Sequence, residues 1–117
     1  MIHRGDICWV DLDPTVGSEQ NKRRPVVVVT NNGANGIVDQ NRRGVLTVVP
    51  VTSNVSRVYP FQVLLPAARV SGLRNDSKAL AEQIRSVDYS RIGPSVGSLP
   101  RDLLDELDAA IRLHLAL

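Results

Sequence analysis

The sequence predicts a mainly β fold, an antiparallel barrel or sandwich with one helix packed on it. Short runs of β-branched and apolar residues, separated by turn residues, fill most of the chain, and a leucine stripe with helical spacing occupies its end. The chain has no alternation of strands and helices and no glycine-rich turn between a strand and a helix. A Rossmann or phosphate-loop enzyme is therefore excluded.

Length and composition indicate one globular domain. The chain has 117 residues, of which 43% are hydrophobic and 22% charged, and we expect residues 1–117 to form a single domain. Its only cysteine, Cys8, excludes a disulfide framework and favours a reducing compartment. No stretch resembles a signal peptide or a membrane span, so we expect a cytoplasmic protein that does not bind membranes.

The first strand is predicted at residues 6–12, which are rich in β-favouring types and end before Pro14. Residues 15–24 carry polar and charged side chains without a helical stripe, which predicts a loop. The continuous β-branched run at residues 25–30 is too short for a helix and predicts a strand that is covered on both faces.

The middle of the chain predicts a long loop and a further strand. Residues 31–44 contain three glycines and four asparagines, which predicts an extended, turn-rich loop. Residues 45–52 form the next apolar run, and Pro50 within it favours an edge position or a bulge.

The remaining elements are a short strand, an ambiguous segment and a helix. Residues 61–65 predict a strand closed by Pro66. Residues 78–87 fit helical and alternating patterns, and we interpret them as a strand. Residues 100–117 predict a helix with Ser98 as a start signal. The helix would bury a stripe made of Leu103, Leu104, Leu107, Ile111 and Leu115.

Metal and thiol chemistry have little support. His3 and His114 are the only histidines, far apart in the chain, and the sequence has neither a paired-histidine motif nor an acidic calcium loop. We expect no metal site. Cys8 lies inside an apolar run, and we expect it to be a small buried hydrophobe and not a nucleophile.

Two polar clusters follow or precede the buried strands. Glu19 stands five residues before Arg24, with Lys22 and Arg23 between them. A guanidinium beside a rigid strand can bind phosphate oxygens and stabilise developing charge, although a solvated loop fits this spacing equally well. Thr52 and Ser53 offer hydroxyls at the end of another strand, where such residues also simply close strands.

The charge distribution permits a polyanionic ligand. Residues 1–97 carry 12 basic and 8 acidic side chains, which is compatible with a polyanion-binding face and with an ordinary solvated surface. Aromatic residues are scarce, so a sheet of base-stacking aromatics is not expected.

The order of motifs resembles the MazF/PemK family, the endoribonuclease halves of bacterial toxin-antitoxin pairs. The matching segments run from near residue 4 to the terminal helix. They are Arg4 to Pro14, Gly17-Ser-Glu-Gln20, Arg24-Pro25 with its valine run, Val49-Pro-Val-Thr-Ser53, Tyr59-Pro-Phe61 and Ala81-Glu-Gln-Ile-Arg-Ser-Val87.

This resemblance implies an SH3-like antiparallel β-barrel of the CcdB/PemK type with a C-terminal helix, assembled as a homodimer. It further implies sequence-specific, metal-independent cleavage of single-stranded mRNA, no cofactor, and a cognate MazE-like antitoxin. By the same resemblance Arg24 and Thr52 are catalytic, and Glu19 matches a glutamate that is catalytic in some members. The resemblance places Ser53 and Gln83 near the RNA, and we expect Lys22, Arg23, Gln20 and Arg85 to bind the RNA as well.

Two segments depart from the resemblance. Residues 21–23, Asn-Lys-Arg, add charge where family members often have small residues, and the length and composition of residues 31–44 are not set by the family. We expect both segments to influence which sequence is cut.

Metal-free cleavage is chemically reasonable because RNA carries its own nucleophile, the ribose 2′-hydroxyl. We expect Glu19 to act as the base, Thr52 to bind a nonbridging oxygen and Arg24 to stabilise the phosphate charge, leaving a 2′,3′-cyclic phosphate or 3′-phosphate and a 5′-hydroxyl. The main alternative is a non-catalytic module of the same fold that acts on gyrase or nucleic acid. A third is an interaction module that uses Trp9 and the leucine stripe for assembly.

Overall fold

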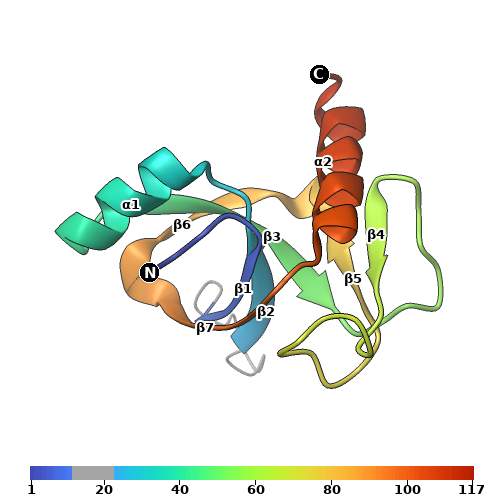
Figure 1. The fold of residues 1–117 in the computed structure, drawn as a ribbon. Helices are drawn as coiled ribbons and strands as arrows, with labels where there is room; N and C mark the ends of the chain where they lie inside the picture. The colour runs from blue at the N-terminus through green and yellow to red at the C-terminus, as the bar shows by residue number, and fades with distance from the viewer. Residues whose placement is uncertain (12–22) are drawn as a thin grey trace, which may run out of the picture.

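The computed structural model describes residues 1–11 and 23–117, and Figure 1 shows a strongly bent sheet with one helix on each side of it. The strands are β1 (Asp6–Asp11), β2 (Arg23–Val28), β3 (Val45–Thr52), β4 (Gln62–Leu65), β5 (Ser77–Leu80), β6 (Arg85–Asp88) and β7 (Ile92–Ser98). The helices are α1 (Asn32–Asn41) and α2 (Arg101–Leu115), with single 3-10 turns at η1 (Ala81–Gln83) and η2 (Tyr89–Arg91). No helix among these residues is long and apolar enough to cross a membrane.

The described strands pair throughout in antiparallel fashion, in the order β4-β5-β3-β2-β1-β7, and β6 adds to β3. The prediction of a mainly antiparallel β fold with a C-terminal helix is confirmed. The strands predicted at residues 6–12, 25–30, 45–52 and 61–65 occur within two residues of their predicted bounds.

Pro50 lies in the centre of the sheet, so the predicted edge position is wrong. On one side of β3, Pro50 is opposite Val26 of β2. On the other side, β6 pairs with β3 up to Val48 and β5 pairs from Val51 onward. The proline therefore occupies the interval where β3 changes partners, which is where a missing ladder donor costs least.

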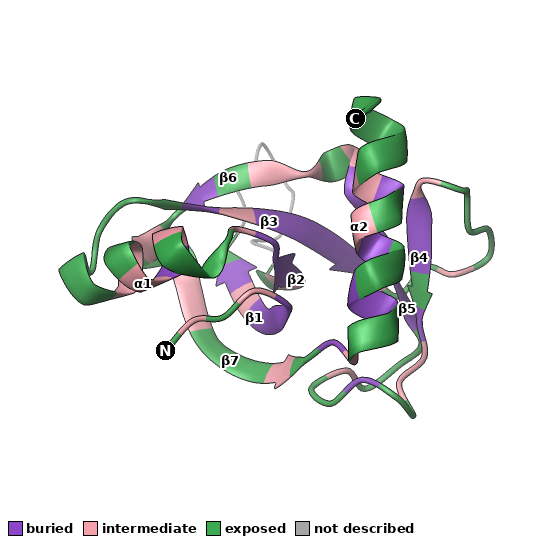
Figure 2. Cartoon of the chain, turned by 45° about the horizontal axis from the view of Figure 1, so that its top comes forward, coloured by how far each residue is buried: buried purple, intermediate pink, exposed green. Residues whose placement is uncertain are grey.

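The valine run of β2 contributes to two buried clusters on opposite faces of the sheet, because side chains alternate along a strand. Val27 and Val29 belong to the larger cluster, which α2 covers with Leu103, Leu104, Leu107 and Ala110. Val26 and Val28 belong to a smaller cluster with Cys8, Val10, Val48 and Val87. Figure 2 shows the buried stripe of α2 turned toward the sheet and its exposed stripe turned outward.

The prediction of a loop at residues 31–44 is wrong for most of that segment, because residues 32–41 form α1. Asn31 caps the helix by accepting a hydrogen bond from the Ala34 amide at 2.8 Å. Arg42 then adopts the left-handed conformation at φ 55° and ends the helix. Asn35 is fully buried and donates to the Thr30 carbonyl at 2.8 Å. Two of the asparagines that suggested a loop thus serve as the helix cap and as a buried anchor, and two of the glycines lie inside the helix.

The C-terminal half needs three corrections. The segment 78–87 is not one strand, because η1 separates β5 from β6. β7 was not predicted, since its glycines and proline are typical of turns. Helix α2 starts after Pro100, which makes no side-chain cap, and Ser98 belongs to β7 and is not the start signal.

Candidate functional site

An open pocket of about 820 Å³ lies where the start of β2 meets the end of β3. It is lined by Trp9, Arg23, Arg24, Pro25, Val51, Thr52, Ser53, Gly72, Leu73, Arg74, Asn75, Ser77 and Val96. Four predicted site residues, Arg23, Arg24, Thr52 and Ser53, thus share one pocket although nearly 30 positions separate Arg24 from Thr52 in the chain.

Strand register explains why Arg24 and Thr52 meet. β2 and β3 are antiparallel with Val26 opposite Pro50, and continuing this register by two residues sets Arg24 across from Thr52. Directly opposed side chains project from the same face of a sheet and lie within reach of one another. The valine-rich pairing of β2 with β3 therefore brings Arg24 and Thr52 next to each other on one face of the sheet.

The two neighbouring arginines at the start of β2 differ in their partners. Arg23 is exposed and its Nε lies 3.6 Å from the Asp11 carboxylate. Arg24 is half-buried, and its side chain makes no hydrogen bond or ion pair within residues 1–11 and 23–117. A half-buried guanidinium without a carboxylate partner is poorly solvated and favours an anion in the pocket.

Local hydrogen bonds shape the chain around the two hydroxyl groups. Thr52 Oγ1 accepts a hydrogen bond from the Asn54 amide at 3.3 Å, and Asn54 Oδ1 accepts from the Ser56 amide and hydroxyl. On the other side of β3, Thr52 pairs with Lys78, whose buried ammonium donates to the Arg57 carbonyl at 2.5 Å. These contacts hold in place the segment that follows β3.

Residues 72–75 form a wall that the sequence did not predict. This wall belongs to the connection between β4 and β5, defined here as residues 66–76, and it packs against β7. A Cβ on Gly97 would lie 1.9 Å from the Ser71 carbonyl oxygen, and one on Gly72 would lie 2.6 Å from the Val96 carbonyl oxygen. The approach of two backbones needs glycine at both positions. Nothing in the local pattern of residues 66–76 indicates where that connection would pack.

The remaining predicted positions divide into those that the structure describes and those that it does not. Glu19, Gln20 and Lys22 lie outside the described residues. Gln83 is exposed in η1 and Arg85 lies on β6 opposite Val48, and neither lines the pocket. Trp9, which the interaction-module alternative used for assembly, lines the pocket beside Arg23.

Within the part of the chain that the structure describes, no group of three histidine, cysteine, aspartate or glutamate side chains is arranged to hold a metal ion. Cys8 is fully buried, and burial, with a smaller contribution from the Asp6 charge, raises the pKa of its thiol to about 11. The prediction that Cys8 is a buried hydrophobe is confirmed, because such a thiol is neither accessible nor ionised at neutral pH.

Comparison with protein families gives a match over residues 3–115, to the family described as PemK-like, MazF-like toxin of type II toxin-antitoxin system. The chain belongs to this toxin family. The toxin is 53% identical to endoribonuclease MazF9 of Mycobacterium tuberculosis, over 100% of this chain and 98% of that protein. It is 34% identical to endoribonuclease EndoA of Bacillus subtilis, over 100% and 97% of the two chains.

Solved structures of this toxin family have the same fold. A MazE-MazF crystal structure from Deinococcus radiodurans superposes with a TM-score of 0.78 at 31% identity, covering 99% of this chain and 96% of that one. A crystal structure of MazF from the same organism has a TM-score of 0.75 at 31% identity, covering 99% and 97%. The resemblance inferred from the order of motifs is therefore confirmed.

Proposed function

We propose that this protein is a metal-independent endoribonuclease, the toxin of a toxin-antitoxin pair, and that it cleaves single-stranded mRNA in the pocket between β2 and β3. Endoribonuclease activity follows from membership of the toxin family and from whole-length relatives that are endoribonucleases. The observation that supports this site is that Arg24 and Thr52 line one pocket, and that the half-buried Arg24 side chain has no partner among the described residues.

The proposed chemistry uses the substrate's own 2′-hydroxyl. Its proton passes to a base, for which Glu19 is the candidate, and the 2′-oxygen attacks the adjacent phosphorus while the bond to the 5′-oxygen breaks. The leaving 5′-oxygen takes up a proton from water and becomes the 5′-hydroxyl. Arg24 stabilises the negative charge that develops on the phosphate oxygens, and the Thr52 hydroxyl donates to one of them. Because a guanidinium keeps its proton in proteins, the role of Arg24 is electrostatic.

Further parts of the proposal concern assembly. We propose that the toxin forms a homodimer and binds a MazE-like antitoxin, as the MazE-MazF structures of Deinococcus radiodurans suggest for the antitoxin. We also propose that the sheet closes into an SH3-like barrel. Packing of residues 71–72 against β7 supports closure, because β4 and β7 stand at opposite ends of the strand order.

Product analysis tests the reaction. The purified protein is incubated with a long RNA in EDTA, and the cut sites are mapped. A short RNA that contains one cut site is then cleaved, and the masses of its products are measured by mass spectrometry. We expect a 2′,3′-cyclic phosphate or 3′-phosphate and a 5′-hydroxyl, and no cleavage when the nucleotide before the cut carries deoxyribose. A 3′-hydroxyl with a 5′-phosphate would refute the mechanism.

Substitutions test the site. Arg24→Ala should lower the cleavage rate by roughly 100-fold or more, as removal of one transition-state donor does elsewhere, and Thr52→Val should also lower it. Arg69→Ala is the matched control, since Arg69 is an exposed arginine outside the pocket. Circular dichroism checks that the variants fold. Full activity of Arg24→Ala would remove Arg24 from the mechanism, and absence of RNA cleavage by the parent protein would favour the non-catalytic module.

A further inference from the structure

A second unpaired guanidinium stands at the pocket. Arg74 lines the pocket and is exposed, and no hydrogen bond or ion pair joins its side chain to any other residue that the structure describes. Arg69, in the same connection, instead bonds the Asp102 carboxylate at 2.8 Å. The mechanism proposed above gives Arg74 no task.

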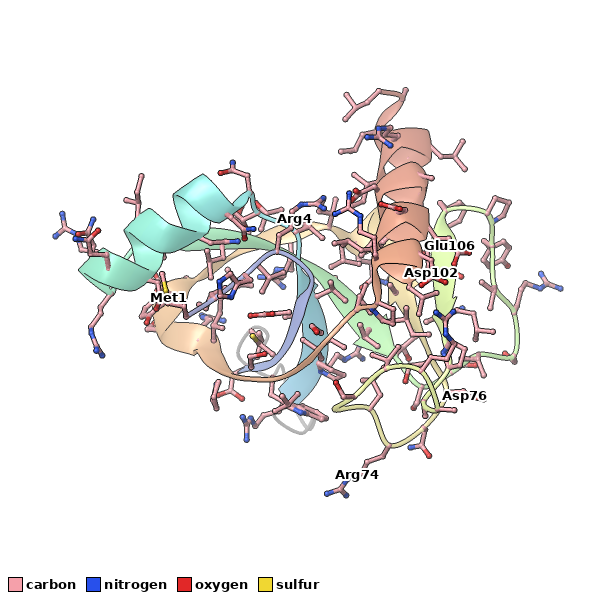
Figure 3. The ribbon with its side chains drawn as sticks, viewed as in Figure 1. Met1, Arg4, Arg74, Asp76, Asp102 and Glu106 are labelled. Atoms are coloured by element: carbon pink, nitrogen blue, oxygen red, sulfur yellow. The ribbon has the colours of Figure 1, made fainter. Side chains whose placement is uncertain are left out.

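The backbone that carries Arg74 is held on both sides of it. The close approaches of Gly72 and Gly97 pin the connection to β7. On the other side of Arg74, Asp76 Oδ1 accepts from the Ala67 amide at 2.9 Å, and the Ser77 hydroxyl donates to the Asn75 carbonyl at 2.9 Å. Figure 3 shows Arg74 reaching from this connection away from the ribbon and into solvent. The charge is thus presented from an anchored backbone at the mouth of the pocket.

Trp9 supplies a flat surface in the same pocket. It sits on β1 opposite Pro25, the residue that follows Arg24, and it is half-buried. Proteins bind single-stranded nucleic acid by stacking bases on aromatic side chains beside cationic groups that contact the phosphates. An indole and a guanidinium in one pocket provide that combination, and Arg23 lines the same pocket.

We propose that Trp9 and Arg74 form a second subsite, which holds a nucleotide flanking the cleaved linkage. Trp9 stacks on its base and Arg74 contacts its phosphate. This inference rests on the proposed function, because it assigns a position on the same RNA. Neither residue touches the reacting atoms in this arrangement, so both act in binding and in the choice of cut site.

Fluorescence offers a direct test because Trp9 is the only tryptophan in the chain. The probe is a short RNA with the mapped cut site and deoxyribose before the cut, which binds without being cleaved. Binding of this RNA should quench the fluorescence of Trp9. An RNA whose flanking nucleotide is abasic should bind without quenching that fluorescence. Replacing Trp9 by Leu should weaken binding between about 5-fold and 100-fold, with Trp9→Phe restoring most of it.

The salt dependence of RNA affinity tests Arg74. Arg74→Ala should weaken binding and reduce the slope of log affinity against log salt by about 0.7, the value for one phosphate contact on a single strand. Arg69→Ala should leave both quantities unchanged. For cleavage, Arg74→Ala should raise KM, with kcat close to that of the parent protein.

Failure of the subsite is distinguishable from failure of the proposed function. If Arg74→Ala and Arg69→Ala give the same affinity and slope, or RNA binding leaves Trp9 fluorescence unchanged, the subsite is wrong while cleavage dependent on Arg24 stands. If poly-glutamate quenches Trp9 as strongly as the RNA does, the subsite is one for acidic peptide and the inference is overturned. If Arg24→Ala cleaves at the full rate, the proposed function itself fails.

Discussion

Among single residues, Arg4 differs in its contacts from Arg24 and Arg74 at the pocket. Arg4 forms a two-pronged contact with Asp108 and donates from Nε to the Val29 carbonyl, so it ties the N-terminal segment to α2. Arg24 and Arg74 have no such partners in the described chain. Arg4 thus supports the fold through a carboxylate, whereas Arg24 and Arg74 stand at the pocket with hydrogen-bond donors that a ligand there could use.

Burial of Cys8 leads to a prediction about its reactivity. With a pKa of about 11, only about one thiol in a thousand is ionised at pH 8, and the sulfur is inaccessible as well. We expect a thiol reagent to label the native protein only slowly at pH 8 and to label it quickly in denaturant. Rapid labelling of the native state would show that the first strand opens readily or is less buried than described.

The hydrogen-bonded pair Asp39 and Tyr89 leads us to expect that stability depends on pH in both the acidic and the alkaline range. The hydrogen bond from the Tyr89 hydroxyl at 3.0 Å, with a second from the Ile2 amide, lowers the pKa of Asp39 below its ordinary 3.8. The same bond to Asp39, with burial, raises the pKa of Tyr89 above its ordinary 10.0.

A lowered carboxyl pKa contributes stability that is present above the unfolded-state pKa and is lost as pH falls through the folded-state pKa. A raised tyrosine pKa contributes stability that is present below 10 and is lost as pH rises further. We expect the thermal midpoint to decrease when the pH is lowered below about 4 and when it is raised above about 10. Tyr89→Phe should make both decreases smaller. Identical pH profiles for Tyr89→Phe and the parent would contradict this linkage.

Among elements, α1 shows how tertiary contacts can support a segment with poor helix propensity. Its 10 residues include two glycines and three asparagines, all weak helix formers. The helix nevertheless has a capped start, a left-handed end and a buried anchor, Asn35, which also bonds Asn32. Such a helix depends on its cap and its contacts more than on intrinsic preference.

The cap of α1 can be tested by substitution. Asn31→Ala removes the acceptor for the Ala34 amide and should lower the free energy of unfolding by about 1 kcal/mol. Gln40→Ala, at an exposed position of the same helix, is the control and should change it by less than about 0.5 kcal/mol. Urea titrations followed by circular dichroism give both values. A cost for Asn31→Ala no larger than that of the control would mean that the cap contributes nothing.

Across the whole molecule, the contact between residues 66–76 and β7 links the two ends of the strand order and builds one wall of the pocket. Gly97→Ala would place a methyl group 1.9 Å from the Ser71 carbonyl oxygen, so one of the backbones must move. We expect a loss of roughly 1–3 kcal/mol in urea unfolding, typical of overpacking, together with weaker RNA binding.

Gly36→Ala is the control for this contact. Gly36 lies inside α1 with nothing within 4 Å of an added Cβ, so alanine should stabilise the protein by about 0.5–1 kcal/mol through helix propensity. If Gly97→Ala were as well tolerated as Gly36→Ala, residues 66–76 would not be held against β7 as described.

The sequence by itself determined the elements whose patterns are locally strong: the valine run of β2, the apolar run of β3, and the leucine stripe of α2. It also determined which residue types stand at the strand ends, since Arg24, Thr52 and Ser53 were chosen from motifs and all line the pocket. The catalytic roles of these residues stay predictions. Local propensity succeeds here because each signal is carried by consecutive or periodic residues.

Only the tertiary structure decided what depends on distant contacts. These include the helix at residues 32–41, the position of Pro50 where β3 changes partners, the strand β7 built from glycine and proline, and the wall that brings Arg74 and Trp9 into one pocket. The physical reason is that strand register and close backbone approach are settled by packing between segments far apart in the chain, which no local window of residues contains.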